Sequence, residues 1–231
     1  MSLRIEGEIP FEQRLARRET EILQVVPSSF RGIRHPLITA LGNIPEEVSG
    51  KVVADMGSGM GGLAKSAHIE GIDTTIWSIN PSLRRKEFQI WQRSPLTMQI
   101  ALGKDYPQAT KEHIAAAQQY HDAHSSSNFA HSLTDFPDDF FDVAIDNWAV
   151  HGYMPRGDQE MYDMTIGEML RVIKPGGKII VGYAGRTDLW EEKGIAKVGL
   201  ARRHVLWERI PLSKPAKVLL APGVTIFKPE K

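Results

Sequence analysis

Residues 52–62 constrain the fold of this 231-residue chain more than any other segment. They read VVADMGSGMGG, an apolar run that ends in the acid Asp55 and continues into glycines at every second position. Residues 63–67 then have the pattern of a helix start. A strand, a tight glycine turn and a helix form the unit that binds adenosine-containing cofactors in α/β proteins.

Two cofactor classes fit this turn. A G-x-G-x-x-G spacing that ends at Gly62 indicates a dinucleotide, whereas a D-x-G-x-G-x-G spacing that starts at Asp55 indicates S-adenosylmethionine. Asp55 favours S-adenosylmethionine, because a carboxylate at the turn repels phosphates and suits a cationic ammonium and sulfonium. An NADP site stays open as an alternative, since Arg84 and Arg85 follow the next strand and could pair with a 2′-phosphate.

The composition narrows the classes of partner and chemistry. Acids and bases balance at 28 each, so the chain as a whole has no electrostatic attraction to nucleic acid or to anionic membranes. The sequence contains no cysteine, which excludes disulfides, thiolate nucleophiles and cysteine metal sites. No apolar run is long enough for a membrane span. We therefore expect a cytoplasmic protein that binds no metal, no membrane and no nucleic acid.

Strand and helix patterns alternate after the glycine turn. The predicted strands include residues 74–79, a strand at Phe129, and residues 141–146, 178–182, 204–208 and 224–227. The predicted helices include 157–173 and 186–198. The three serines at 125–127 are expected to form a loop. This alternation predicts an α/β, Rossmann-like, doubly wound and mostly parallel seven-stranded sheet with helices on both faces, built from residues 49–231.

Two further segments are expected to cap the sheet. Residues 9–26 have the pattern of an amphipathic helix within an N-terminal helical cap segment, residues 1–48. A long insert, residues 83–125, is predicted to hold helices at 83–91 and 108–123, joined by a loop around Pro95 and Gly103. Such an insert covers a ligand cleft or enlarges the core, and the sequence leaves both open. Its histidines, His121 among them, are expected to be solvated or to lie on a lid.

Two later segments, residues 136–151 and 169–180, carry a family likeness. They read FPDDFFDVAIDNWAVH and MLRVIKPGGKII. Together with residues 55–61 they resemble class I S-adenosylmethionine-dependent methyltransferases, especially the small-molecule branch that includes the ubiquinone and menaquinone methyltransferases. The likeness covers roughly residues 50–185.

The resemblance implies roles for particular residues. The glycines would let the backbone approach the cofactor, Asp55 would steer its ammonium group, and Asn80 would stand at the ribose position where the family has an acid. The position facing the adenine falls at Ala130 or His131, and Asp135 is the nearest acid. The residues expected to bind the cofactor are Asp55, Gly57, Ser58, Gly59, Gly61, Asn80, His131, Ser132, Asp135, Asp146 and Asn147.

His151 is the candidate general base, because it follows the fourth predicted strand and histidine titrates near neutral pH. The function expected from the sequence is transfer of a methyl group from S-adenosylmethionine to a small-molecule acceptor. The departures at Asn80 and at the adenine position leave two alternatives: an NADP-binding oxidoreductase, or a catalytically silent binding protein with the same fold.

Overall fold

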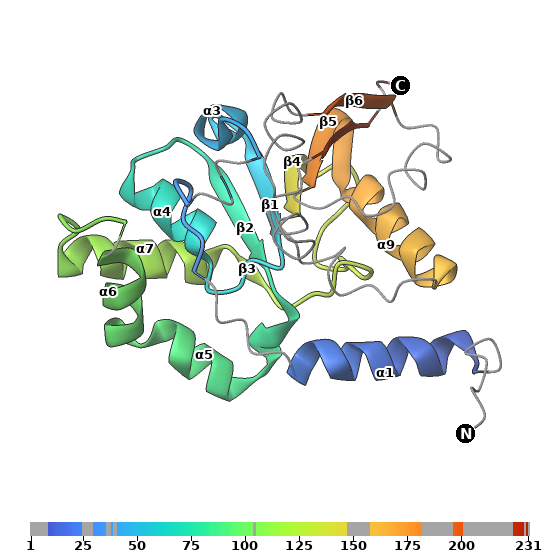
Figure 1. The fold of residues 1–231 in the computed structure, drawn as a ribbon, viewed down its shortest axis with the longest axis horizontal. Helices are drawn as coiled ribbons and strands as arrows, with labels where there is room; N and C mark the ends of the chain where they lie inside the picture. The colour runs from blue at the N-terminus through green and yellow to red at the C-terminus, as the bar shows by residue number, and fades with distance from the viewer. Residues whose placement is uncertain are drawn as a thin grey trace, which may run out of the picture.

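The computed structural model describes residues 9–24, 30–35, 38, 41–103, 105–146, 158–181, 196–200, 224–228 and 230. Within them the chain forms one sheet with helices on both faces (Figure 1). The strands are β1 (Val52–Met56), β2 (Thr75–Ile79), β3 (Ser125–Ser126), β4 (Phe141–Asp146), β5 (Ile173–Val181), β6 (Ala196–Leu200) and β7 (Val224–Phe227). The helices are α1 (Phe11–Gln24), α3 (Ile44–Val48), α4 (Gly62–Ile69), the 3-10 helix η2 (Pro81–Arg84), α5 (Lys86–Arg93), α6 (Pro95–Gly103), α7 (Lys111–Ala123) and α9 (Gln159–Val172).

The sheet is mixed, with strand order β3-β2-β1-β4-β5-β7-β6. The pairs from β3 to β5 are parallel, and β7 runs antiparallel to both β5 and β6. The order reverses between β1 and β4, and ligands of open α/β sheets bind outside the carboxyl ends of the strands at such a switch point. The predicted α/β Rossmann-like fold is confirmed, and the fold directs attention to the ends of β1 and β4.

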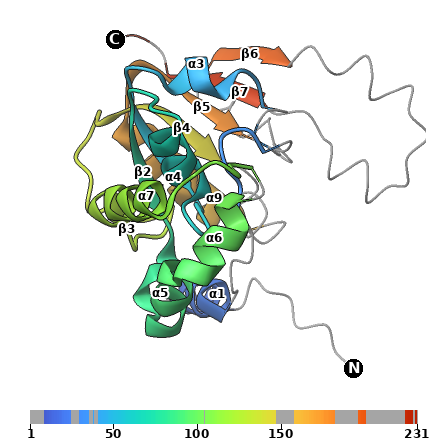
Figure 2. The ribbon, with the colours of Figure 1, turned by 90° about the vertical axis from the view of Figure 1, so that its left-hand side faces the viewer.

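Alternating side chains of the buried strands build a core on each face. Ala54, Met56 and Ala144 belong to the cluster beneath α9, whereas Val53 and Ile145 belong to the cluster beneath α4 and α3. Figure 2 shows the sheet nearly edge-on. Because both faces are covered, the central strands read as continuous apolar runs, which is why the sequence reveals them so clearly.

The insert between β2 and β3 forms a third, smaller core. Met98 and Leu102 of α6 pack with Tyr106 against Met60 of the glycine turn. The prediction of a loop around residues 95–103 is therefore wrong. These residues form α6, in which Met98 and Leu102 lie four positions apart on one helical face. The predicted helix at residues 108–123 is confirmed as α7.

Three further expectations need correction. The third strand is Ser125–Ser126, within the serines expected to form a loop, and not at Phe129. It pairs with β2 through backbone hydrogen bonds and shows no apolar pattern. β5 already begins at Ile173, so the lysine–proline–glycine–glycine segment lies inside an irregular strand. The helix expected at 186–198 is wrong at its end, where β6 pairs with β7. The strand predicted at 204–208 lies outside the described residues.

Helix α1 lies along the carboxyl edge of the sheet and contains no buried residue. Figure 1 shows it below the sheet and α9, to the right of α5. Glu19 contacts the segment after β3, the carbonyl of Leu23 accepts a hydrogen bond from Arg85 after η2, and Arg14 binds Asp158 before α9. The contacts of α1 thus reach the segments that follow three parallel strands. Among the described residues, no helix is long and apolar enough to cross a membrane.

Candidate functional site

The glycine turn connects β1 to α4 at the switch point. Gly57, Gly59 and Gly61 have φ angles of 65°, 56° and 68°, a left-handed conformation that glycine adopts without steric cost. The N–H groups of Gly57 and Ser58 donate to the carbonyl of Ile79, at 2.8 and 3.2 Å. The turn is therefore fixed to the end of the neighbouring strand β2.

Side chains beneath the turn bind its carbonyl groups. The Gly59 carbonyl accepts from Asn80 Nδ2 at 2.8 Å and from Gln92 Nε2 at 3.5 Å, and the Met60 carbonyl accepts from Lys65 Nζ at 2.8 Å. The N–H groups of Gly59 and Met60 donate to no residue that the structure describes. The carbonyls are thus held toward the protein, and backbone donors of the turn remain available.

Asp55 is a buried acid at the end of β1, with 6% of its surface exposed. Burial raises the pKa of its carboxyl to about 7; the Arg31 guanidinium opposes this effect and Asp146 adds to it. No residue of the described part of the chain forms a hydrogen bond with this carboxylate. Burying a carboxylate without such hydrogen bonds is costly, so the site suits a ligand that brings positive charge.

Two neighbouring groups extend the site. The Ser58 hydroxyl is buried without a hydrogen-bond partner in the described part of the chain, which leaves a donor and an acceptor for a ligand at the turn. Asp146, fully buried at the end of β4, pairs in register with Met56. The structure thus brings Asp55, Ser58 and Asp146 to one edge of the sheet, as the sequence predicts. Asn147 and His151 lie outside the described residues.

Asn80 lies at the end of β2, as predicted, but its side chain serves the local structure. Besides the bond from Nδ2 to Gly59, Oδ1 accepts from the backbone N–H of Ser82 at 3.0 Å and caps η2. The side chain is 3% exposed. One N–H and one lone pair of the amide remain for a ribose.

The segment after β3 holds the other predicted residues. His131 stacks on Phe129, with ring centroids 5.1 Å apart, and its Nε2 lies 2.9 Å from Glu19 Oε1. Asp135 accepts a 2.6 Å hydrogen bond from the Ser126 hydroxyl, and the N–H of Ser132 donates to the Phe129 carbonyl. His131 therefore fastens α1 to this segment, and Asp135 holds the segment to β3.

Sequence reasoning missed a buried group under the turn. His121 of α7 is fully buried, so the expectation of a solvated or lid residue is wrong. A Cβ atom at Gly61 would lie 2.0 Å from His121 Cδ2, and a Cβ atom at Gly62 would lie 2.7 Å from the Arg31 backbone. Packing inside the protein therefore requires both glycines. No sequence signal connects residues 60 positions apart, so only the tertiary structure reveals the contact.

Lys65 is the second buried group that was missed. Its side chain is fully buried, and burial lowers the pKa of its ammonium group to about 7. It binds the Met60 carbonyl and contacts Met98 of α6. A signal was present, because Leu63, Ala64 and Ala67 around it belong to the apolar face of α4.

The arginines that suggested NADP are engaged elsewhere. The Arg84 guanidinium lies 4.7 Å from the Phe129 ring centroid and donates from Nε to the Ser127 carbonyl. Arg85 donates from Nη1 to the Leu23 carbonyl of α1 at 2.9 Å. Both side chains thus connect segments of the protein.

Comparisons with known proteins support the fold. No family model and no curated sequence match the chain. Among solved structures, the Burkholderia thailandensis 1,6-didemethyltoxoflavin-N1-methyltransferase, determined with its substrate and S-adenosylhomocysteine, aligns over 100% of this chain and 94% of its own, at 14% identity and a TM-score of 0.53. The YcgJ protein of Bacillus subtilis aligns over 83% and 99%, at 13% identity and a TM-score of 0.49. The first structure shows that the chain has the Rossmann-like fold of a methyltransferase.

Proposed function

We propose that this chain is an S-adenosylmethionine-dependent methyltransferase with a small-molecule acceptor. The observation that carries the proposal is Asp55, a buried carboxylate directly beneath a glycine turn at the switch point of the sheet, which accepts no hydrogen bond from the residues that the structure describes. The cationic ammonium of S-adenosylmethionine would supply the missing partner. The methyltransferase of similar fold that binds S-adenosylhomocysteine supports the same cofactor.

The residues present fit this cofactor. Asp55 would bind its ammonium group, the Ser58 hydroxyl and the backbone donors of Gly59 would bind its polar atoms, and the remaining capacity of Asn80 would face the ribose. The cofactor supplies a methyl group that its sulfonium charge already activates. The chain's own task is then to orient the acceptor and to exclude water.

The acceptor would bind between the ends of the strands and α1. Helix α1, together with the rest of residues 1–48, would serve as a cap over the domain of residues 49–231, and its three polar attachments would set its position. Asp146 would lie beside the acceptor. Asn147 as a cofactor ligand, His151 as general base and a cytoplasmic location stay predictions. The equal number of acidic and basic residues favours a small-molecule acceptor over nucleic acid. The resemblance of residues 169–177 supports the branch that includes the ubiquinone and menaquinone methyltransferases.

Calorimetry with S-adenosylmethionine, S-adenosylhomocysteine and NADPH tests the proposal. We expect the first two to bind and NADPH to bind weakly or not at all. Asp55→Ala and Asp55→Asn should weaken S-adenosylmethionine binding by at least about tenfold, since a charge-assisted contact contributes roughly 1.5–3 kcal/mol. Asp105→Asn, at an exposed acid, is the matched control.

The two Asp55 variants also have a predicted effect on stability. The folded pKa of Asp55 lies above its unfolded value, so its ionisation destabilises the ligand-free protein increasingly as the pH rises toward 8. Asp55→Asn should therefore be more stable than the wild type at pH 8, with a smaller difference at pH 5.

An Asp55 variant that keeps full cofactor affinity contradicts the role of Asp55. Tight NADPH binding alone would favour an oxidoreductase, and binding of none of the three ligands would favour a silent binding protein.

A further inference from the structure

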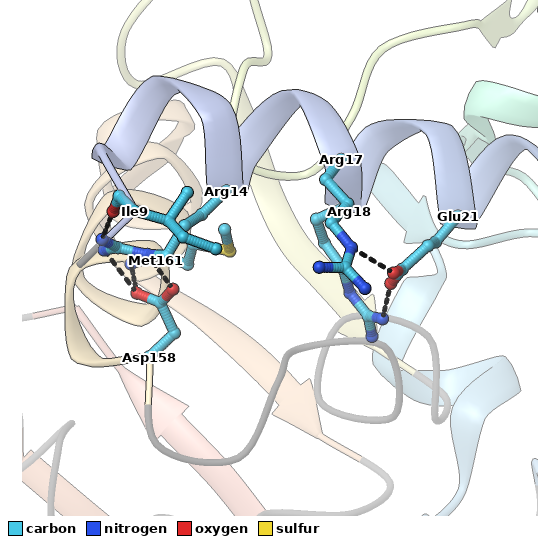
Figure 3. Close-up of a pocket in the computed structure, with 7 residues that line it drawn as sticks. All are labelled: Ile9, Arg14, Arg17, Arg18, Glu21, Asp158 and Met161. Carbon is cyan, nitrogen blue, oxygen red and sulfur yellow. Dashed lines mark hydrogen bonds and ion pairs between the residues drawn. The ribbon is translucent and has the colours of Figure 1, made fainter. Parts of the chain in front are cut away.

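A small cavity lies between α1 and the beginning of α9. Its volume is about 120 Å³, with Ile9 and Met161 as the apolar lining and Arg14, Arg17, Arg18, Glu21 and Asp158 as the polar lining (Figure 3). Sites for whole drug-sized ligands measure roughly 300–1,000 Å³. This cavity therefore has room for one end of a small molecule only.

Arg14 closes one side of the cavity. Its guanidinium donates to Asp158 at 2.8 Å, to Glu160 at 2.9 Å and to the Ile9 carbonyl at 2.9 Å. Asp158 also accepts from the backbone N–H of Met161 and so caps α9. Arg14 thus faces two carboxylates, which engage its charge, and it serves to hold α1 against α9.

The other side of the cavity carries an excess of positive charge. Arg17 and Arg18 share a single acid, Glu21, with contacts of 3.4 and 2.7 Å. Arg18 Nε is buried and has no hydrogen-bond partner among the described residues, and about three quarters of the side-chain surface of Arg18 is covered. Figure 3 shows the two arginines turned toward the carboxylate of Glu21. A buried donor without a partner is costly, and an oxyanion supplies the acceptor that is missing.

The carboxylate of Glu21 shows that Arg17 and Arg18 can bind an anion between them. This carboxylate already accepts from both guanidinium groups, yet 45% of the Glu21 side chain is exposed. A long, half-exposed side chain can turn into solvent while another anion takes its place. The cavity also lies at the acceptor edge, because α9 follows β4 and α1 contacts the segments after β2 and β3.

We propose that this cavity binds the negatively charged end, a carboxylate or a phosphate, of the methyl acceptor, and that Glu21 occupies the place of that group in the free protein. Arg17 and Arg18 would bind the anion, and Ile9 and Met161 would contact the apolar part next to it. The assignment to the acceptor rests on the proposed methyltransferase function. The anion site itself depends only on the cavity and its charges.

NMR titration of the full chain, with and without saturating S-adenosylhomocysteine, tests the site with benzoate, phenyl phosphate and benzyl alcohol. We expect both anions, or one of them, to shift the resonances of α1 and of the start of α9, and benzyl alcohol to bind at least about tenfold more weakly. The stronger of the two anions identifies the group. Equal binding of benzyl alcohol, or no binding of either anion, overturns the proposal.

Two variants with opposite expected effects sharpen the test. Arg18→Gln should weaken anion binding about tenfold, whereas Glu21→Gln should tighten it several-fold because the competing carboxylate loses its charge. Arg34→Gln, at an exposed arginine that pairs with Glu70 away from the cavity, is the control and should change nothing. Because α1 contains no buried residue, these variants should fold, and circular dichroism checks this.

The outcomes separate this inference from the proposed function. If S-adenosylhomocysteine does not bind while the anions bind with the expected variant effects, the methyltransferase proposal fails and the anion site stands. If S-adenosylhomocysteine binds but neither Arg18→Gln nor Glu21→Gln changes anion affinity, the anion site is overturned and the methyltransferase proposal stands.

Discussion

Replacing Asn80 by aspartate separates two roles of this residue. The methyltransferases that the sequence resembles have an acid at the ribose position, so a ribose-binding role predicts tighter cofactor binding for Asn80→Asp. The structure predicts the opposite. Asn80 Nδ2 donates to the Gly59 carbonyl at 2.8 Å, and an ionised carboxylate would direct an oxygen at that oxygen instead.

The magnitude follows from the contacts that change. Oδ1 would still accept from Ser82, while the Gly59 carbonyl would keep only the 3.5 Å contact with Gln92. Leaving a buried polar group unsatisfied costs about 1–3 kcal/mol, so we expect a loss of about 2 kcal/mol in unfolding free energy at pH 7. If the binding free energy of S-adenosylhomocysteine falls by the same about 2 kcal/mol, because the turn no longer holds its binding conformation, the affinity decreases about 30-fold.

Urea unfolding and calorimetry measure both quantities. The buried aspartate would have a raised pKa, and its protonated form can donate to Gly59, so the deficit relative to wild type should shrink from pH 7 to pH 5. Asn43→Asp, at an exposed position without a side-chain cap bond, controls for the added charge. Tighter S-adenosylhomocysteine binding by Asn80→Asp at pH 7 would refute the reasoning.

Two further predictions concern the groups beneath the turn. Gly61→Ala should lower the unfolding free energy by about 3 kcal/mol or more, because it adds left-handed backbone strain and a steric overlap with His121. Adding His121→Ala should restore part of this loss in urea unfolding. A lack of rescue would contradict the packing of Gly61 against His121. The pKa of Lys65 is lower in the folded than in the unfolded protein, so the unfolding free energy of the wild type relative to Lys65→Met should rise by up to about 1.4 kcal/mol per pH unit above pH 7. If this difference between the two proteins does not change up to pH 9, the buried amine is not neutral.

Local patterns predicted the central parts of the fold. Val52–Met56 and Phe141–Asp146 are apolar runs buried on both faces, and a strand of this kind is visible in the sequence because both sets of alternating side chains must be apolar. The two-residue strand Ser125–Ser126 has no such signal, because its place is set by backbone hydrogen bonds to β2. The helix α6 was missed because its flanking proline and glycine indicate a loop.

The sequence by itself determined that a strand, a glycine turn and a helix occur at residues 52–69, and that Asp55 ends the strand. Only the tertiary structure decided how the neighbouring side chains are used. It assigns the Asn80 amide to the Gly59 carbonyl, buries His121 against Gly61 and places Arg18 and Met161 in the lining of one cavity. The reason is physical: backbone conformation depends on residues close in sequence, whereas burial and hydrogen-bond partners depend on contacts between residues far apart in the chain.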